Sequence, residues 1–110
     1  MANIYKNAFL DLTTSNTTIY TTPSDSRAII QNIQVANDLT NNINVDVFIN
    51  DSSASSNHEI AHDQLSTKET INLAKGPVIL EENDYIFANA GANGSAHLTL
   101  SILEINRNDQ

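Results

Sequence analysis

Residues 27–37 have the sequence Arg-Ala-Ile-Ile-Gln-Asn-Ile-Gln-Val-Ala-Asn, the longest run in the chain with the two-residue alternation of a half-buried β-strand. The residues expected to face a core are branched and apolar: Ile29, Ile33 and Val35. The residues expected on the opposite side, beside the one apolar exception Ile30, are small or polar: Ala28, Asn32 and Gln34. The run therefore predicts a central strand, with one face in the core and the other facing water or a partner.

A second alternating run closes the chain and is the expected partner of this strand. Between residues 96 and 105, three apolar side chains alternate with polar ones: Leu98, Leu100 and Ile102. Leu103 and Ile105 then fall on the other side, so the sequence predicts a change of phase near the end of the strand.

Short strands of this kind recur along the chain. The cleanest one has four apolar residues in strict alternation: Ile43, Val45, Val47 and Ile49. Further strands are expected at residues 4–13, 17–22, 69–74, 78–80 and 85–88, whereas residues 58–65 are ambiguous. Turn-forming clusters separate the strands, and no segment has a convincing helical pattern. We predict one all-β domain over residues 1–110, an antiparallel β-sandwich of seven or eight short strands, either immunoglobulin-like or a jelly roll.

The composition narrows the classes of partner. Thirteen acidic against five basic residues give a net charge of −8, which repels phosphate backbones and disfavours a nucleic-acid partner. The chain has no cysteine, so neither a disulfide framework nor a thiolate metal site is available. No apolar run approaches the ~20 residues of a membrane-spanning helix, and the first residues lack the apolar core of a signal peptide. We therefore expect a soluble protein without a membrane partner.

One motif has a catalytic counterpart, because His58-Glu59-Ile60-Ala61-His62 matches the His-Glu-x-x-His of zinc metalloproteases. That chemistry requires a helix, where residues four apart lie about 6 Å apart and aim both imidazoles at one ion. On a strand the two histidines would be about 13 Å apart, too far to share a zinc ion about 2.0–2.1 Å from each nitrogen. The surrounding pattern is that of strands, and no third ligand follows at a protease spacing. We therefore predict no catalytic, cofactor-binding or metal-binding residue, and retain a zinc-dependent hydrolase as the second alternative function.

The three tyrosines of the chain, Tyr5, Tyr20 and Tyr85, could supply a binding surface. Single tyrosines in strands are more often half-buried core residues with a solvated hydroxyl, and this is our interpretation of all three.

Several stretches, mostly near the two ends, together resemble one protein family. They are residues 2–8 (Ala-Asn-Ile-Tyr-Lys-Asn-Ala), 11–14 (Asp-Leu-Thr-Thr), 18–24 (Thr-Ile-Tyr-Thr-Thr-Pro-Ser), 27–30 (Arg-Ala-Ile-Ile), 77–82 (Pro-Val-Ile-Leu-Glu-Glu) and 101–105 (Ser-Ile-Leu-Glu-Ile). In these stretches the chain is similar to small virion structural proteins of tailed phages that infect marine bacteria, notably cyanobacteria. The similarity fades between residues 38 and 74. It implies a β-sandwich building block of the phage particle and no catalytic residue.

The resemblance leads us to expect a non-enzymatic virion protein, and specifically a decoration or cement protein that bridges subunits on the capsid surface. Its partners would be the major capsid protein or other virion proteins, with further copies of the chain in a homo-oligomer, and no cofactor would be needed. The first alternative places the protein in the tail or neck, as a structural or adsorption module that recognises a cell-surface glycan.

The amino-terminal segment is the expected site of contact with a neighbour. Ile4, Tyr5 and Phe9 put large apolar side chains near a chain end, where disorder is usual unless the segment is tied down. We name these three residues as candidate assembly contacts. In the competing interpretation, residues 4–13 are an edge strand of their own sandwich, with Phe9 in the core. The sequence leaves the two interpretations open.

Overall fold

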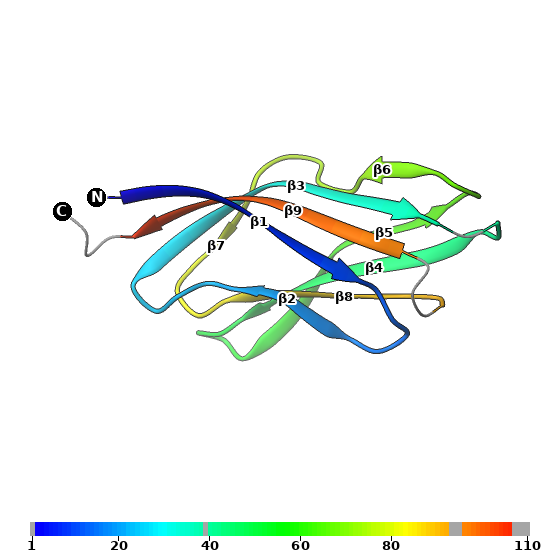
Figure 1. Cartoon of the computed structure of the whole chain (residues 1–110). Helices are drawn as coiled ribbons and strands as arrows, with labels where there is room; N and C mark the ends of the chain where they lie inside the picture. The colour runs from blue at the N-terminus through cyan, green and yellow to red at the C-terminus, as the bar shows by residue number, and fades with distance from the viewer. Residues whose placement is uncertain (1, 39, 93–95, 107–110) are drawn as a thin grey trace.

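The computed structural model describes residues 2–38, 40–92 and 96–106, and in this part of the chain it contains nine β-strands and no helix. The strands are β1 (Ala2–Asp11), β2 (Thr17–Thr21), β3 (Ser26–Asn37), β4 (Ile43–Asp51), β5 (Ser56–Leu65), β6 (Thr70–Asn72), β7 (Val78–Leu80), β8 (Tyr85–Ala90) and β9 (Ala96–Asn106). They form two sheets that pack face to face (Figure 1), which confirms the predicted all-β sandwich. Within the described residues, no helix has the length and apolar character needed to cross a membrane.

One sheet has five strands in the order β1-β9-β3-β6, with β7 paired to another part of β3. The other sheet has four strands in the order β2-β8-β4-β5. The first half of the chain pairs with the second half in a nested, antiparallel way, as in one long hairpin. β4 pairs with β5, β3 with β6 and β7, β2 with β8, and β1 with β9. This long hairpin folds back on itself, which adds the pairs β4–β8 and β3–β9.

This nested pairing is the jelly-roll topology. An immunoglobulin-like sandwich keeps its first two strands in one sheet and its last two in one sheet. Here β1 and β2 lie in different sheets, and so do β8 and β9. The topology therefore decides between the two architectures that the sequence left open. The strand beyond the predicted seven or eight is β5, which occupies the ambiguous segment.

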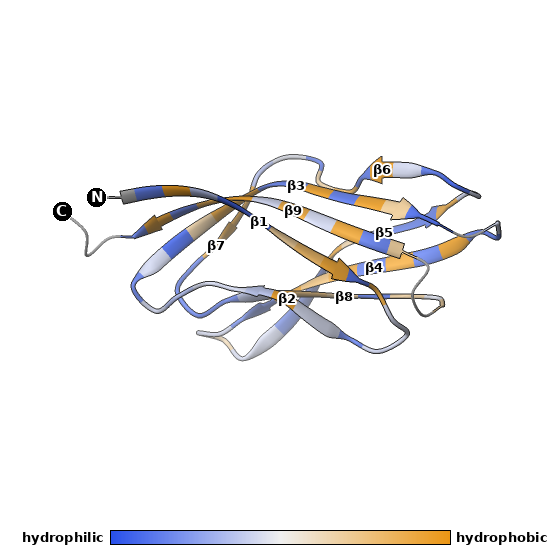
Figure 2. Cartoon of the chain, viewed as in Figure 1, coloured by the Kyte–Doolittle hydropathy of each residue, from blue (hydrophilic) through white to orange (hydrophobic). Residues whose placement is uncertain are grey.

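The core lies between the two sheets, and β4 contributes to it as predicted. Val45 and Val47 are fully buried, Ile43 is 5% exposed, and Ile49 packs against the same cluster. Figure 2 shows the underlying alternation of apolar and polar residues along β3, β4 and β9.

A β-bulge in β3 changes which of its side chains face the core. Ile30 pairs with Ile102 and Asn32 pairs with Ser101, so Gln31 is an extra residue on β3. Before the bulge the buried residues have even numbers, and after it they have odd numbers: Ser26, Ala28 and Ile30, then Ile33, Val35 and Asn37. The prediction is confirmed for Ile33 and Val35. It is wrong for Ala28 and Ile30, which face the core, and for Ile29, which faces away from it, because the inserted residue reverses the alternation.

In β9, core-facing and outward-facing residues alternate without interruption to the end of the strand. Its buried residues all have even numbers: Ala96, Leu98, Leu100, Ile102 and Glu104. The predicted change of phase at Leu103 and Ile105 is therefore wrong, because the extra residue of this strand pair lies in β3. The position that faces the core at the end of β9 holds a carboxylate, Glu104, which is 6% exposed.

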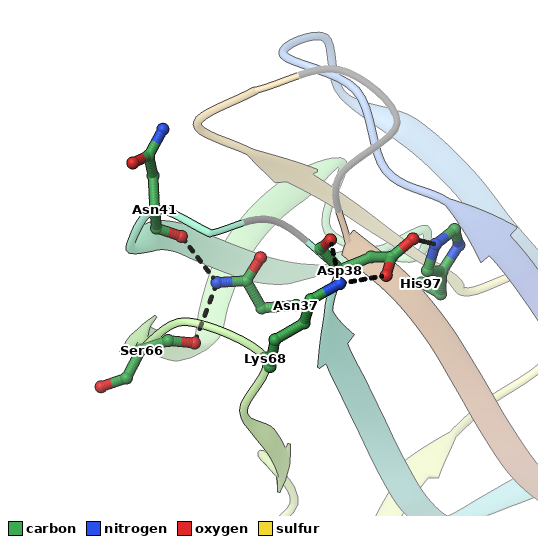
Figure 3. A network of polar contacts seen from close by, with 6 residues as sticks. All are labelled: Asn37, Asp38, Asn41, Ser66, Lys68 and His97. Atoms are coloured by element: carbon green, nitrogen blue, oxygen red, sulfur yellow. Dashed lines mark hydrogen bonds and ion pairs between the residues drawn. The ribbon is translucent and has the colours of Figure 1, made fainter.

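A network of polar contacts closes one end of the sandwich (Figure 3). The buried Asn37, the last residue of β3, donates from Nδ2 to the backbone carbonyl of Ser66 at 2.9 Å. Lys68 Nζ lies 3.1 Å from one carboxylate oxygen of Asp38, and the other carboxylate oxygen lies 3.6 Å from Nε2 of His97. These cations, above all the hydrogen bond from Lys68, hold the pKa of Asp38 below its ordinary value. The contacts tie the loop that follows β5 to the ends of β3 and β9.

Candidate functional site

An apolar row crosses the outer face of the five-stranded sheet. Tyr5 of β1 is the cross-strand partner of Leu103 of β9. Leu103 also pairs with Ile29 of β3, and Ile29 pairs with Ile79 of β7. Neighbouring strands lie about 4.8 Å apart, so the row is about 14 Å long. We call these four residues the apolar row.

The row is uncovered at both of its ends. Tyr5 is 76% exposed and Ile79 is 64% exposed, while Leu103 and Ile29 are half-buried between them. Adjacent residues on the same strands, such as Leu80 and Ile102, are buried in the core, so the row faces away from it. The two exposed ends make this row a candidate for contact with another surface.

Polar side chains lie on both sides of the apolar row, together with the half-buried Ile105 of β9, which is the cross-strand partner of Arg27. On one side, Arg27 of β3 lies with its Nε 3.3 Å from Oε1 of Glu82. On the other side, Asn7 of β1 pairs with Ser101 of β9. An apolar centre with a polar rim is the usual make-up of a protein interface.

The three predicted contact residues do not share one surface. Tyr5 and Phe9 lie on the outer face of β1, four residues and therefore about 13 Å apart, and Phe9 is 68% exposed. Ile4 lies on the opposite side of the strand and is 46% exposed. The segment is an edge strand of its own sandwich, as the competing interpretation held, but Phe9 is not in the core.

Three members of the apolar row were missed from the sequence: Ile29, Leu103 and Ile79. Ile29 was assigned to the core because the bulge in β3 was not foreseen. Ile79 is the middle residue of the apolar β7, and alternation alone requires that it point away from its neighbours Val78 and Leu80. Tyr20 and Tyr85 are half-buried as predicted, but the Tyr20 hydroxyl donates to the buried Glu104 and not to water, and Tyr85 lies outside the core. The interpretation is wrong for Tyr5, which is exposed.

The His-Glu-x-x-His residues lie on a strand, β5, and not on the helix that zinc proteases require. A bulge at Ile60 interrupts the pairing of β5 with β4. Nε2 of His58 lies 3.0 Å from the hydroxyl of Ser56, whereas Nδ1 of His62 is paired with Asp46 of β4. The two imidazoles therefore have separate partners.

The bulge instead brings Glu59 to the same side as His62. One ligand atom each from Asp46, Glu59 and His62 lies within 4.8 Å of the others. The carboxylate of Asp46 raises the pKa of His62, which favours the protonated imidazole that cannot bind a metal. Glu59 and His62 are also exposed, whereas structural zinc sites are closed and four-coordinate. That the chain binds no structural zinc stays our prediction.

The Glu104 carboxylate, near the end of β9, is hydrogen-bonded to the other sheet and ion-paired within its own sheet. Glu104 accepts a hydrogen bond from the hydroxyl of Tyr20 on β2 at 2.5 Å and lies 3.3 Å from Nζ of Lys6 on β1. Burial, followed by the Glu104 carboxylate, raises the pKa of Tyr20, which keeps the phenol protonated as a donor. Each polar group has its partner, so this cluster stabilises the fold and leaves no reactive group free.

Solved structures resemble the sandwich over nearly all of its length. A chain from the acid-stable capsid of Helicobacter pylori bacteriophage KHP30 matches with a TM-score of 0.58 and 14% identity, covering 96% of this chain and 88% of that one. A chain from Bacillus endospore appendages, which form a family of disulfide-linked pili, matches with a TM-score of 0.53 and 10% identity, over 96% of this chain and 87% of that one. A chain of the cyanophage Pam1 capsid gives a TM-score of only 0.45, at 10% identity over 94% of this chain and 85% of that one.

Because the identities are low, the likenesses to the KHP30 capsid chain and to the endospore-appendage chain show the fold alone. No protein-family model and no curated protein sequence matches the chain.

Proposed function

We propose that the chain is a non-enzymatic structural protein of a phage virion, and that it decorates the capsid surface. Three observations support the proposal. The stretches near both ends resemble virion proteins of tailed phages. The fold matches a chain of a phage capsid along 96% of the length of this protein. The jelly roll is also a fold that viral capsid proteins use, although a fold by itself does not fix a function.

The observation that carries the proposal is the apolar row on the outer face of the five-stranded sheet. Its exposed ends, Tyr5 and Ile79, supply two large side chains whose burial would each contribute about 1.5–3 kcal/mol to binding. A protein that binds only the assembled lattice stabilises that lattice by its own binding free energy. In the proposed mechanism, the row packs across a junction between capsid subunits and adds contact area that resists internal pressure.

The proposed partners are the major capsid protein or neighbouring virion proteins, and further copies of the chain. The chain would be made in the cytoplasm of the host and would join the particle at its surface. The net charge of −8 makes identical copies repel each other, so we place the apolar row against the capsid and not against a second copy. Contacts between copies in a homo-oligomer would then use other surfaces.

The test is co-sedimentation of the purified chain with capsids that lack it. The wild-type chain should sediment with the capsids in a fixed ratio to the capsid subunits. A Tyr5→Ser, Ile79→Ser double variant should lose about tenfold to a hundredfold in affinity for each residue removed from the interface. Because both side chains are mostly exposed in the free protein, the variant should keep the melting temperature of the wild type.

The matched control is Ile4→Ser, which shortens an exposed apolar side chain on the opposite side of the same strand. It should bind capsids like the wild type. Equal binding by the double variant and the wild type would exclude the apolar row as the contact. A few copies per particle, in place of a lattice-wide number, would favour the alternative position in the tail or neck.

A further inference from the structure

The outer face of the four-stranded sheet carries a cluster of three aromatic rings. Phe48 of β4 is the cross-strand partner of Phe87 of β8, and their rings stack with centroids 5.1 Å apart and planes 10° apart. Tyr85 follows on the same face of β8, with its ring centroid 5.8 Å from that of Phe87. Phe87 is only 6% exposed, although it is not part of the core between the sheets. These rings form an aromatic floor outside the core.

Asparagine amides flank this floor on two sides. Oδ1 of Asn16 accepts a hydrogen bond from Nδ2 of Asn89 at 2.7 Å, and Oδ1 of Asn57 accepts one from Nδ2 of Asn50, also at 2.7 Å. Among the hydrogen bonds of the described residues, Nδ2 of Asn16 and Nδ2 of Asn57 donate in none. Both residues are exposed, so each offers two N–H donors to a ligand.

Two rings of the floor, Tyr85 and Phe87, line a shallow hollow of about 250 Å³ together with the amides of Asn16 and Asn57, whereas Phe48 lies outside the hollow. Its lining residues are all uncharged, although the chain as a whole is strongly acidic: Asn16, Thr18, Asn57, Tyr85 and Phe87. A charged ligand would therefore find no counter-charge in the hollow. A purely apolar ligand would cover the amides without giving them hydrogen-bond partners, which costs free energy.

We propose that this hollow binds one ring of a neutral carbohydrate. A sugar ring has apolar C–H faces that pack on aromatic side chains, and hydroxyl groups that accept hydrogen bonds from amide N–H groups. The hollow offers both kinds of group side by side and lacks charge. The site lies on the face opposite the apolar row, so a chain bound to a surface through that row would keep the hollow open.

The test is an NMR titration of the ¹⁵N-labelled full chain with glucose, galactose, mannose and N-acetylglucosamine, each added separately. At least one of these sugars should give saturable shifts of backbone amides confined to residues 16–18, 56–58 and 85–87. Glucuronic acid should bind more weakly than glucose, because the chain is acidic and the hollow has no cation. The absence of saturable shifts with all four neutral sugars would overturn the proposal, and so would shifts centred elsewhere.

The variant Asn57→Ala tests the site without touching the aromatic floor. It removes one pair of donors from an exposed position on an edge strand, and should weaken binding about threefold to tenfold. Asn44→Ala is the matched control, since Asn44 is an exposed asparagine of the same sheet outside the hollow, and it should leave affinity unchanged. Equal affinities of the two variants would also overturn the proposal. Failure here leaves the capsid experiment unaffected, because that experiment concerns the other sheet.

Discussion

Two exposed histidines each contact a carboxylate directly across a strand pair. His97 of β9 lies opposite Asp11 of β1, with Nδ1 2.6 Å from Oδ1, and His62 of β5 lies opposite Asp46 of β4. The hydrogen bond to each carboxylate is the main cause that raises the pKa of its histidine above the ordinary value of 6.5. Each contact between histidine and carboxylate therefore favours the protonated imidazole.

Each histidine should therefore titrate in the folded chain above pH 6.5. Since the pKa is raised on folding, the stabilising effect is complete below pH 6.5 and is lost as the pH rises through the raised pKa. NMR titration of the imidazole signals measures both values. Asp11→Asn should lower the pKa of His97 alone, and Asp46→Asn should lower that of His62 alone. A variant that shifted neither histidine, or both equally, would contradict these pairings.

A different residue-scale effect is expected at Thr22. Its hydroxyl Oγ1 is the one buried side-chain polar atom of the described residues without a hydrogen-bond partner. Thr22→Val removes that atom at nearly constant shape and should raise the free energy of unfolding by about 1–3 kcal/mol. Urea unfolding measures the change. Thr21→Val, at the exposed neighbouring position, should have almost no effect. A destabilised Thr22→Val variant would show that Oγ1 has a partner, such as an ordered water molecule.

At the scale of strands, the local pattern predicted most of the elements but not their irregularities. β4 was predicted correctly because its alternation with core-facing Val45 and Val47 is uninterrupted against β8. β3 was predicted as a strand, yet half of it was assigned to the wrong face, because an inserted residue such as Gln31 has no signature in residue types alone. β5 remained ambiguous because it is a polar edge strand, broken by its own bulge at Ile60.

The bulge in β3 and the pairing of β4 with β8 explain which residues of the candidate sites could be predicted from the sequence. Tyr5 and Phe9 were found because they are large apolar residues near a chain end. Ile29 could not be found, because its exposure depends on the bulge that reverses the face of β3. The aromatic floor could not be found either, since Phe48 and Phe87 meet only when β4 and β8, distant in sequence, pair in the observed register.

The register of β4 gives an element-scale prediction. Val47 is fully buried, whereas Asn44 is exposed on the same strand. Val47→Asp should place an unpaired charge in the core and cost several kcal/mol, enough to threaten a domain with a total stability of ~5–15 kcal/mol. Asn44→Asp should change the melting temperature little. Similar melting of the two variants in thermal denaturation would mean that this register is wrong.

For the whole molecule, the jelly roll leaves two outer faces with different chemistry. The five-stranded sheet presents the apolar row, which suits a protein surface, and the four-stranded sheet presents an uncharged hollow that suits a sugar. If both proposals hold, the chain is attached by one face and displays the other. This would reconcile the decoration role with the recognition of a glycan, which the sequence could present only as alternatives.

The role of β1 in the whole fold can be separated from its role in assembly. Deleting residues 2–7 removes six of the ten cross-strand pairs between β1 and β9, and it removes Lys6 from the buried Glu104. We therefore expect the truncated chain to lose about 2 kcal/mol of stability or more, because a hydrogen bond to a buried charged group is lost together with the strand pairing.

Tyr5→Ser in the full chain keeps the backbone pairing and Lys6, so its thermal transition should match that of the wild type. Thermal unfolding followed by circular dichroism compares the three proteins directly. A truncated chain that melted like the wild type would show that β1 adds nothing to the cooperative fold, and residues 2–7 would then be free to act as an arm that reaches a neighbour.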